Sequence, residues 1–419
     1  MIVFDNVKIF TDNIEPEALQ MVHNMSAILK DRTIRVMPDC HVGKGAVIGT
    51  TFTDGDIICP SHVGVDIGCS VSTYITDKPI NPEEYALIEH RIRKEIPFGM
   101  DINEHTQIDY KDFYKYMRNQ LSGVGLIGTF DEEAVSDICQ AIGMDEGRFY
   151  KSLGTVGGGN HFIEIGVTSD GRYAITIHTG SRNFGAKVCN FWERYANSRK
   201  IDKELEKQLI AEAKRNTVDK HKLPEIIKEI KAKLRDDNLP MGYLKGAAKN
   251  HYMYDAAVAQ FYASYNHKVI ADKIVKIIGC RITMTIMSRH NYIDFIDGVI
   301  RKGAIRAVQG QLMVIPFNMR DGIGIFEGKS NPDWNYSAPH GSGRAKSRAK
   351  AKETISLVEF KKQMEGIYST SVCKETLDEA PDAYKDTQEI LDLIEPTCRL
   401  VVFIKPVINL KATNGDGEI

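Results

Sequence analysis

The chain has 419 residues and a mass of 47.0 kDa, and 42% of its residues are hydrophobic, so it can bury one large core or two ordinary ones. Lysine and arginine (54) nearly balance aspartate and glutamate (56), which excludes a strongly basic nucleic-acid coat protein but not a local basic groove. We find no signal-peptide pattern, no apolar run of membrane-spanning length and no CxxC pair among the eight cysteines. We therefore expect a globular protein in the cytoplasm, with no membrane partner.

The first part of the chain predicts short strands and turns, followed by helices. Residues 1–10 alternate apolar and polar side chains, and the glycine-rich stretch 42–68 has few helix signals. Residues 82–150 have a mixed and helical pattern, in which Asn81 is placed to cap a helix that begins at Pro82. This order of patterns indicates a β-rich start.

The rest of the chain predicts helices between strands. Residues 171–180 alternate like a strand, 186–279 have a helical pattern with a highly charged middle, and 282–288 and 399–405 return to strand character. The charges in the middle of the helical part indicate a solvated helical face. Because strands from both ends and the middle must share a core, we expect one α+β domain over 1–419, with a β-sheet core, surrounding helices and a mainly helical insertion.

Several short segments combine potential metal ligands with glycine or with the end of a strand. Asp66 and Cys69 lie in VGVDIGC, His161 lies in GGGNHFIEI, and His178 and His290 end apparent strands. Carboxylate, thiolate and imidazole all bind borderline divalent ions, and one thiolate can bridge two of them. The spacing matches no zinc-finger or zincin pattern, so each residue is equally well interpreted as a buried or turn residue. The residues alone leave both a metal enzyme and a structural role open.

His340 lies in the stretch YSAPHGSGRAKSR, between a proline and two glycines. The stretch lacks the periodicity of a core helix or strand, and its glycines would let the backbone approach a phosphate. One interpretation is a polar loop that enters a basic helix, and the other is a nucleophile or ligand held on tight turns. The basic residues that follow are a candidate grip for RNA phosphates, or else a solvated helical face: Arg344, Lys346, Arg348, Lys350 and Lys352.

Six motifs together resemble the RtcB family of GTP-dependent RNA ligases, and they occur in that family's order. They are MPDCHVGKGAVIG (37–49), VGVDIGC (63–69), GGGNHFIEI (157–165), HTGSRNFG (178–185), RKGAIRA (301–307) and HGSGRAKSR (340–348). The resemblance extends from about residue 37 to residue 412, which is nearly the whole chain.

The resemblance implies two Mn(II) ions, GTP as co-substrate, and His340 as the residue that becomes guanylylated. The implied ligands of one ion are Asp66, Cys69 and His161. The implied ligands of the other are Cys69, His178 and His290, with Cys69 bridging the two ions. The implied contacts to GMP are Asn160, Glu164, Gly341 and Lys411, and the implied phosphate contact is Arg182.

The implied reaction joins RNA ends that carry a 2′,3′-cyclic phosphate or 3′-phosphate to 5′-hydroxyl ends. The cyclic phosphate is opened to a 3′-phosphate, which takes GMP from His340 to give an RNA(3′)pp(5′)G intermediate that the 5′-hydroxyl then attacks. A neutral imidazole can attack the α-phosphorus of GTP if metals and backbone amides take up the charge. A carboxylate such as Glu164 can accept hydrogen bonds from guanine, where adenine offers a mismatched edge.

The chain departs from the usual family pattern at 316–339 and at Cys40 and His41, which follow Asp39. These departures indicate a divergent branch of the family. Whether the RNA ligase serves RNA repair or tRNA splicing, and whether it has an archease-like activator as a partner, stay open. Two rival hypotheses remain. One is a dinuclear metal phosphoesterase that acts on RNA cyclic phosphate ends without ligation, and the other is a non-catalytic RNA-binding protein with the same fold.

Overall fold

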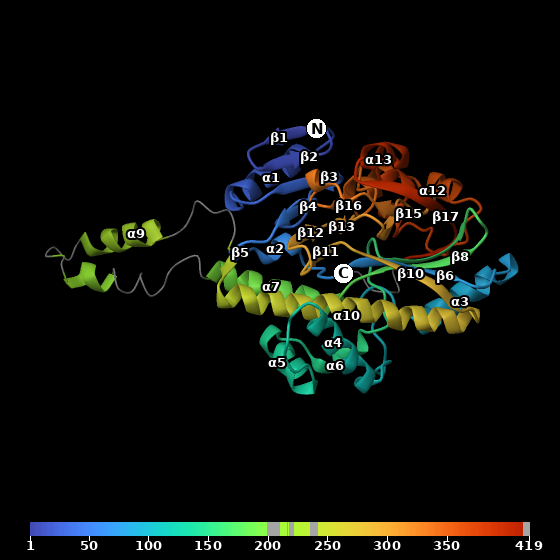
Figure 1. Cartoon of the computed structure of the whole chain (residues 1–419), viewed down its shortest axis with the longest axis horizontal. Coiled ribbons are helices and arrows are strands. Elements are labelled where there is room, and N and C mark those ends of the chain that lie inside the picture. Colours follow the sequence, from blue (N-terminus) through green and yellow to red (C-terminus); the bar gives the residue numbers. More distant parts are fainter. Residues whose placement is uncertain (199–209, 216, 218–221, 235–241, 414–419) are drawn as a thin grey trace.

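The computed structural model of the chain describes residues 1–198, 210–215, 217, 222–234 and 242–413. Two large sheets stand at its centre (Figure 1). The first has six strands in the spatial order β1 (Ile2–Phe4), β2 (Val7–Ile9), β3 (Ile34–His41), β4 (Ile48–Thr53), β12 (Val299–Lys302) and β11 (Asn291–Ile293). The pair β2–β3 is parallel, whereas the other neighbours in this sheet are antiparallel.

The second sheet is antiparallel throughout and nearly closed into a barrel. Its seven strands follow the spatial order β10 (Ile282–Arg289), β6 (Ser70–Thr76), β8 (Tyr173–Thr179), β7 (Phe162–Thr168), β17 (Cys398–Leu410), β15 (Ile323–Gly328) and β14 (Leu312–Pro316). Its two edge strands approach each other, because the backbone N–H of Val314 on β14 donates to Ser288 Oγ on β10 at 2.7 Å. Two small sheets pair β13 (Ala304–Arg306) with β16 (Ser337–Pro339) and β5 (Ile57–Ile58) with β9 (Leu244–Lys245).

Most of the helices pack around the sheets, whereas α9 lies apart from them (Figure 1). In chain order they are α1 (Pro16–Ile28), α2 (Pro60–Val63), α3 (Tyr85–Glu95), α4 (Tyr110–Gly123), α5 (Glu132–Ile142), α6 (Glu146–Lys151), α7 (Arg182–Ser198), α9 (Leu223–Leu234), α10 (Ala247–Ile278), α11 (Arg348–Thr354), α12 (Leu357–Gln363) and α13 (Thr387–Ile394). The 3₁₀ turns are η1 (Pro82–Glu84), η3 (Pro332–Trp334), η4 (Leu377–Glu379) and η5 (Pro381–Ala383). None of the helices in the described ranges combines the length and apolar character of a membrane span.

The long helix α10 runs beside α7 along one side of the sheets (Figure 1). Its central residues Tyr262, Ala263, Ile270 and Ile274 are all buried. Each large apolar side chain that folding removes from water in this way contributes about 1.5–3 kcal/mol. The helix ends where Gly279 takes the left-handed conformation that favours glycine.

The predicted α+β class with a β-sheet core is confirmed, and so are the strands predicted at 171–180, 282–288 and 399–405. The Asn81 cap is confirmed too, since its side chain accepts a hydrogen bond from the Glu83 N–H, although the turn it caps is 3₁₀.

The prediction of strands and turns alone at the start of the chain was incomplete. Helix α1 follows β2 and buries Ala18, Val22 and Met25 on one face, a spacing of three to four residues that sequence reading overlooked. The helical insertion predicted at 186–279 stays a prediction, and much of its charged middle lies outside the described residues.

Candidate metal and nucleotide site

Four potential metal ligands lie where strands of the second sheet begin or end. Cys69 directly precedes β6, His161 directly precedes β7, His178 lies near the end of β8, and His290 directly follows β10. Strand β8 pairs with both β6 and β7, and β10 pairs with β6. Because these neighbours are antiparallel, starts and ends alternate along the sheet, and all four side chains meet at one end of it.

The donor atoms of this cluster lie close together. Cys69 Sγ is 3.3 Å from Nε2 of His161 and 3.3 Å from Nε2 of His178. Nε2 of His178 is 3.4 Å from Nε2 of His290, and Nε2 of His161 is 2.9 Å from Asp66 Oδ2. The atoms form two groups, Asp66–Cys69–His161 and Cys69–His178–His290, and within each group all ligand atoms lie within 4.8 Å of one another. Cys69 is thus shared by both groups.

Two glycines make room for the cluster. A Cβ atom on Gly157 would overlap the imidazole of His161, and a Cβ atom on Gly180 would overlap the carboxylate of Asp66. Close packing against the ligands therefore requires glycine at these two positions.

Two imidazoles of the cluster are ready to bind a cation, whereas the thiol would lose its proton on binding one. Burial lowers the pKa of His178 and of His290 well below the usual value, so both imidazoles are neutral and have a free lone pair. Burial, with a contribution from Asp66, raises the pKa of the Cys69 thiol. Burial also opposes ionisation of Asp66, but His161 outweighs it and lowers the pKa of that carboxyl group. A divalent cation would stabilise the thiolate and the carboxylate together.

A cavity of about 560 Å³ opens beside the cluster, and His340 lies in its wall. His340 directly follows β16, and its Nδ1 is 2.7 Å from Oδ2 of Asp39 on β3. Asp39 is fully buried. The His340 and His290 rings are 4.9 Å apart between centroids. The carboxylate of Asp39 fixes the proton on Nδ1, so the Nε2 lone pair is free.

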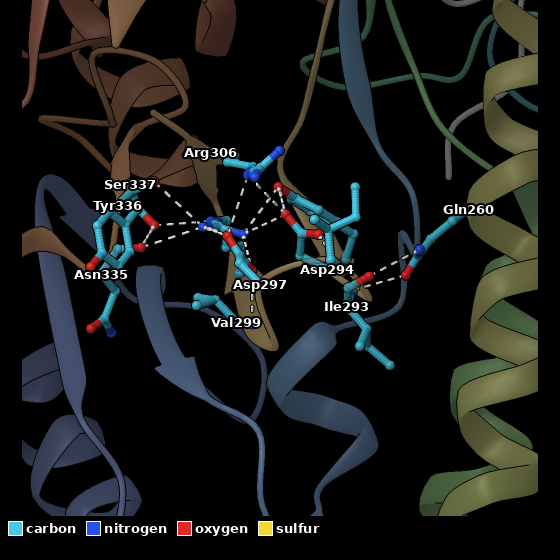
Figure 2. Close-up of polar contacts among 12 residues, drawn as sticks. Gln260, Ile293, Asp294, Asp297, Val299, Arg306, Asn335, Tyr336 and Ser337 are labelled. Atoms are coloured by element: carbon cyan, nitrogen blue, oxygen red, sulfur yellow. Dashed lines mark hydrogen bonds and ion pairs between the residues drawn. The ribbon is translucent and has the colours of Figure 1, made fainter. Parts of the chain in front are cut away.

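A buried ionic network joins the segments that carry His290 and His340 (Figure 2). Arg301 on β12 has no exposed surface, and its guanidinium is 3.0 Å from Asp294 and 2.7 Å from Asp297. It also donates to Ser337 Oγ at 2.9 Å, at the start of the strand that leads to His340. This network fixes the β11–β12 hairpin against β16.

A polar wall of the cavity is formed by β7, β17 and η4. Glu164 Oε2 accepts a hydrogen bond from Asn409 Nδ2 at 2.9 Å, and burial raises the pKa of Glu164 to about 8. Lys411 Nζ donates to the backbone oxygen of Asn160 at 3.3 Å and to Glu379 Oε2 at 3.0 Å. Gly341 also lines this cavity. The four residues that the sequence suggested as GMP contacts therefore share one cavity with His340.

Arg182 lies elsewhere, in a second cavity of about 600 Å³ that shares Asp66 and Asn160 with the first. Its Nε donates to Thr155 Oγ1 at 2.9 Å and its Nη2 donates to the Gly99 carbonyl. Burial lowers its pKa to about 10, so the side chain stays charged at neutral pH. The basic residues that line this second cavity are Arg148, Arg182, Arg348 and Lys352.

The basic run after His340 is only partly available to a ligand. Arg344 is held inside the protein, 3.2 Å from Glu379 and over the Tyr384 ring. Lys352 lies 3.6 Å from Asp378, whereas Lys350 pairs at the surface with Glu353. The run is therefore neither a uniform RNA grip nor a uniformly solvated face.

Two residues of the site escaped sequence reasoning as functional candidates. Asp39 was noted only as part of the opening signature, and Asn409 was not considered. The available signal was a polar side chain next to apolar residues within a strand pattern, RVMPDCH for Asp39 and FIKPVINL for Asn409.

A mixed α+β fold with a buried thiolate, imidazole and carboxylate cluster beside a histidine held by a carboxylate defines a candidate metal-dependent enzyme. The chain belongs to the tRNA-splicing ligase RtcB family, whose model matches residues 19–412. The resemblance seen in the sequence is thereby confirmed.

Curated relatives come from all three domains of life. The chain is 28% identical to the RNA-splicing ligase RtcB of Escherichia coli K12, over 95% of this chain and 97% of the relative. It is 26% identical to the tRNA-splicing ligase RtcB of Nanoarchaeum equitans, over 95% and 92%. It is also 26% identical to an RNA-splicing ligase RtcB homolog of Entamoeba histolytica, over 90% and 80%. These identities fit a divergent branch of the family.

Proposed function

We propose that this chain is an RNA ligase that joins 2′,3′-cyclic phosphate or 3′-phosphate ends to 5′-hydroxyl ends, with GTP and a guanylylated His340. Membership of the RtcB family makes the chain an RNA ligase. The proposal of a guanylylated histidine rests on the contact of His340 Nδ1 with the buried Asp39 carboxylate. His340 lies in the wall of the cavity that the candidate metal ligands also line.

The donor cluster fits two divalent ions, for which we propose Mn(II). One would be held by Asp66, Cys69 and His161, and the other by Cys69, His178 and His290. The mix of thiolate, imidazole and carboxylate suits several transition metals, so cellular supply rather than affinity would select manganese. Bound there, the cations would neutralise charge on phosphoryl oxygens.

His340 supplies the nucleophile. With its proton held on Nδ1 by Asp39, Nε2 attacks the α-phosphorus of GTP, a P–N bond forms, and the bond to the pyrophosphate oxygen breaks. An RNA 3′-phosphate then attacks the same phosphorus and releases His340, which gives RNA(3′)pp(5′)G. The 5′-hydroxyl finally attacks the RNA phosphate, and GMP leaves with the electron pair. Asp39 would stabilise any positive charge on the ring without taking up its proton.

The RNA ends would reach the site through the second cavity. Its guanidinium and ammonium groups, from Arg148, Arg182, Arg348 and Lys352, suit phosphates of any sequence. We leave RNA repair, tRNA splicing and an archease-like activator as alternatives within this proposal. Because all eight cysteines are free thiols, we propose the cytoplasm as the place of action.

A joining assay tests the proposal. RNA with a 2′,3′-cyclic phosphate and a 5′-hydroxyl end is incubated with the protein, while GTP and Mn(II) are omitted in turn. We expect a joined product only when both are present, and none with His340→Ala. Opening of the cyclic phosphate with no joining under any of these conditions would instead support the phosphoesterase hypothesis.

A further inference from the structure

Two buried oxygen atoms in the cavity wall have no hydrogen-bond partner among the described residues. They are Oε1 of Glu164 and Oδ1 of Asn409. The two residues face each other across the β7–β17 pair, and both side chains are almost fully buried. A buried acceptor without a donor is costly, about 1–3 kcal/mol for each group, and in a cavity wall a bound ligand can supply the missing donor.

The hydrogen bond between the two side chains leaves one acceptor free on each of them. Asn409 Nδ2 donates to Glu164 Oε2 at 2.9 Å, which leaves Oε1 of the carboxylate and Oδ1 of the amide free. Both residues line the cavity that contains His340. The pair therefore presents two neighbouring acceptors to whatever enters the cavity.

A donor lies at the same wall. Lys411 directly follows β17, two residues beyond Asn409, and its ammonium group lies over the ring of Phe162 and lines the same cavity. The wall thus offers one donor and two acceptors. The Watson–Crick edge of guanine carries the complementary set, with the O6 acceptor followed by the N1–H and N2–H donors. Adenine would instead place its N1 lone pair opposite an acceptor.

We propose that Asn409 is a specificity-determining residue that accepts a hydrogen bond from the exocyclic amine of guanine, while Glu164 Oε1 accepts from the ring N1–H. This inference rests on the proposed function, because it concerns the guanine nucleotide of the same site. The inference adds a residue that recognises the 2-amino group, because Glu164 can accept a hydrogen bond from N1–H without contacting that group. The nucleotide class is therefore a 2-amino-6-oxopurine rather than any 6-oxopurine.

Binding of GMP and IMP tests the inference, because inosine lacks only the 2-amino group. The native protein should bind GMP more tightly than IMP by about tenfold or more, the equivalent of one hydrogen bond to a buried acceptor. Asn409→Leu should bind GMP and IMP equally, and Asn409→Asp, which keeps an acceptor, should restore the preference. Calorimetry on the metal-loaded protein measures these ratios.

A neighbouring substitution serves as the control. Thr176 faces Glu164 from β8, the other neighbour of β7, and its hydroxyl is bonded to Thr73 at 2.8 Å. Thr176→Val should keep the native GMP/IMP ratio. An unchanged ratio in Asn409→Leu, or no preference in the native protein, would overturn the inference. Guanylylation of His340 is scored separately, so a native GMP preference without labelling would count against the proposed function alone.

Discussion

The contact between His340 and Asp39 decides which ring nitrogen can react. Nδ1 is 2.7 Å from the carboxylate, and the carboxylate has no exposed surface, so water does not compete for this hydrogen bond. A neutral imidazole with its proton on Nδ1 is nucleophilic only at Nε2. Under the proposed function, Asp39 is therefore a positioning residue for His340.

Asp39→Asn should reduce the rate of guanylylation on the order of 10²–10⁴-fold, because an amide can donate to Nδ1 and hold the proton on Nε2 instead. Single-turnover labelling with GTP measures the rate, and metal content by mass spectrometry shows that the cluster is intact. Asp333→Asn, at an exposed surface pair with Lys8, is the matched control and should label at the native rate. Equal rates in both variants would contradict the positioning role.

Glu164 should release a proton when a guanine nucleotide binds. Burial raises its pKa to about 8, against about 4.3 in an unfolded chain, so in the free protein at pH 7 the neutral form dominates. The unfolding free energy therefore falls as pH rises from about 4.3 towards 8. Hydrogen-bond donors from guanine would lower the pKa of Glu164, because they stabilise its ionised form.

Calorimetry in buffers of different ionisation enthalpy counts that proton. At pH 7 we expect close to one proton released per GMP bound by the native protein. Glu164→Gln should bind GMP more weakly and release none. A count of zero in the native protein, with tight GMP binding, would rule out this account of Glu164.

At the scale of elements, the β11–β12 hairpin and β16 are held together by the buried guanidinium group of Arg301, which pairs with two carboxylates. Arg301 contacts Asp294 and Asp297 from the hairpin and Ser337 from β16. Figure 2 labels these three partners. The hairpin begins next to His290, and β16 ends next to His340. The distance between the candidate metal ligand His290 and His340 therefore depends on this network.

Arg301→Leu should lower the unfolding free energy by about 3 kcal/mol, because it removes the main partner of the buried Asp294 and of the partly exposed Asp297 and leaves them only the longer contacts with Arg306. Denaturant unfolding followed by fluorescence measures the loss. Arg281→Leu removes an exposed pair with Asp77 and should cost about 1 kcal/mol or less. If the two variants were equally stable, the network would have no structural importance.

The sequence predicted the parts of the site that are local motifs. Each of the four cysteine and histidine ligands lies at or next to the end of a strand that an alternating pattern or a nearby glycine predicts. The structure brings these side chains together: Cys69, His161, His178 and His290. The pairing of Asp39 with His340 could not be predicted, because 301 residues separate them and periodicity carries no information on which strands of two sheets meet.

The same limit applies to Asn409 and Glu164, which lie 245 residues apart and meet only because β17 pairs with β7. The α+β class followed from the mixture of patterns, but the order of strands did not. Non-local pairings of this kind follow from the packing of the whole core.

At the scale of the molecule, the two sheets contribute different parts of one site. The second sheet carries the donor cluster, and the first carries Asp39 and the hairpin that positions the His340 segment. Residues of both sheets line the first cavity together with His340. This arrangement is the physical basis of the claim that one imidazole accepts a nucleotide beside a pair of cations.

The most direct test of that claim is transfer of label from α-labelled GTP to the protein in the presence of Mn(II), followed by peptide mapping. The account predicts acid-labile, alkali-stable label on the peptide that contains His340. The label should disappear with His340→Ala and with a metal chelator. Label on another residue, or no label from a protein that joins RNA ends, would contradict it.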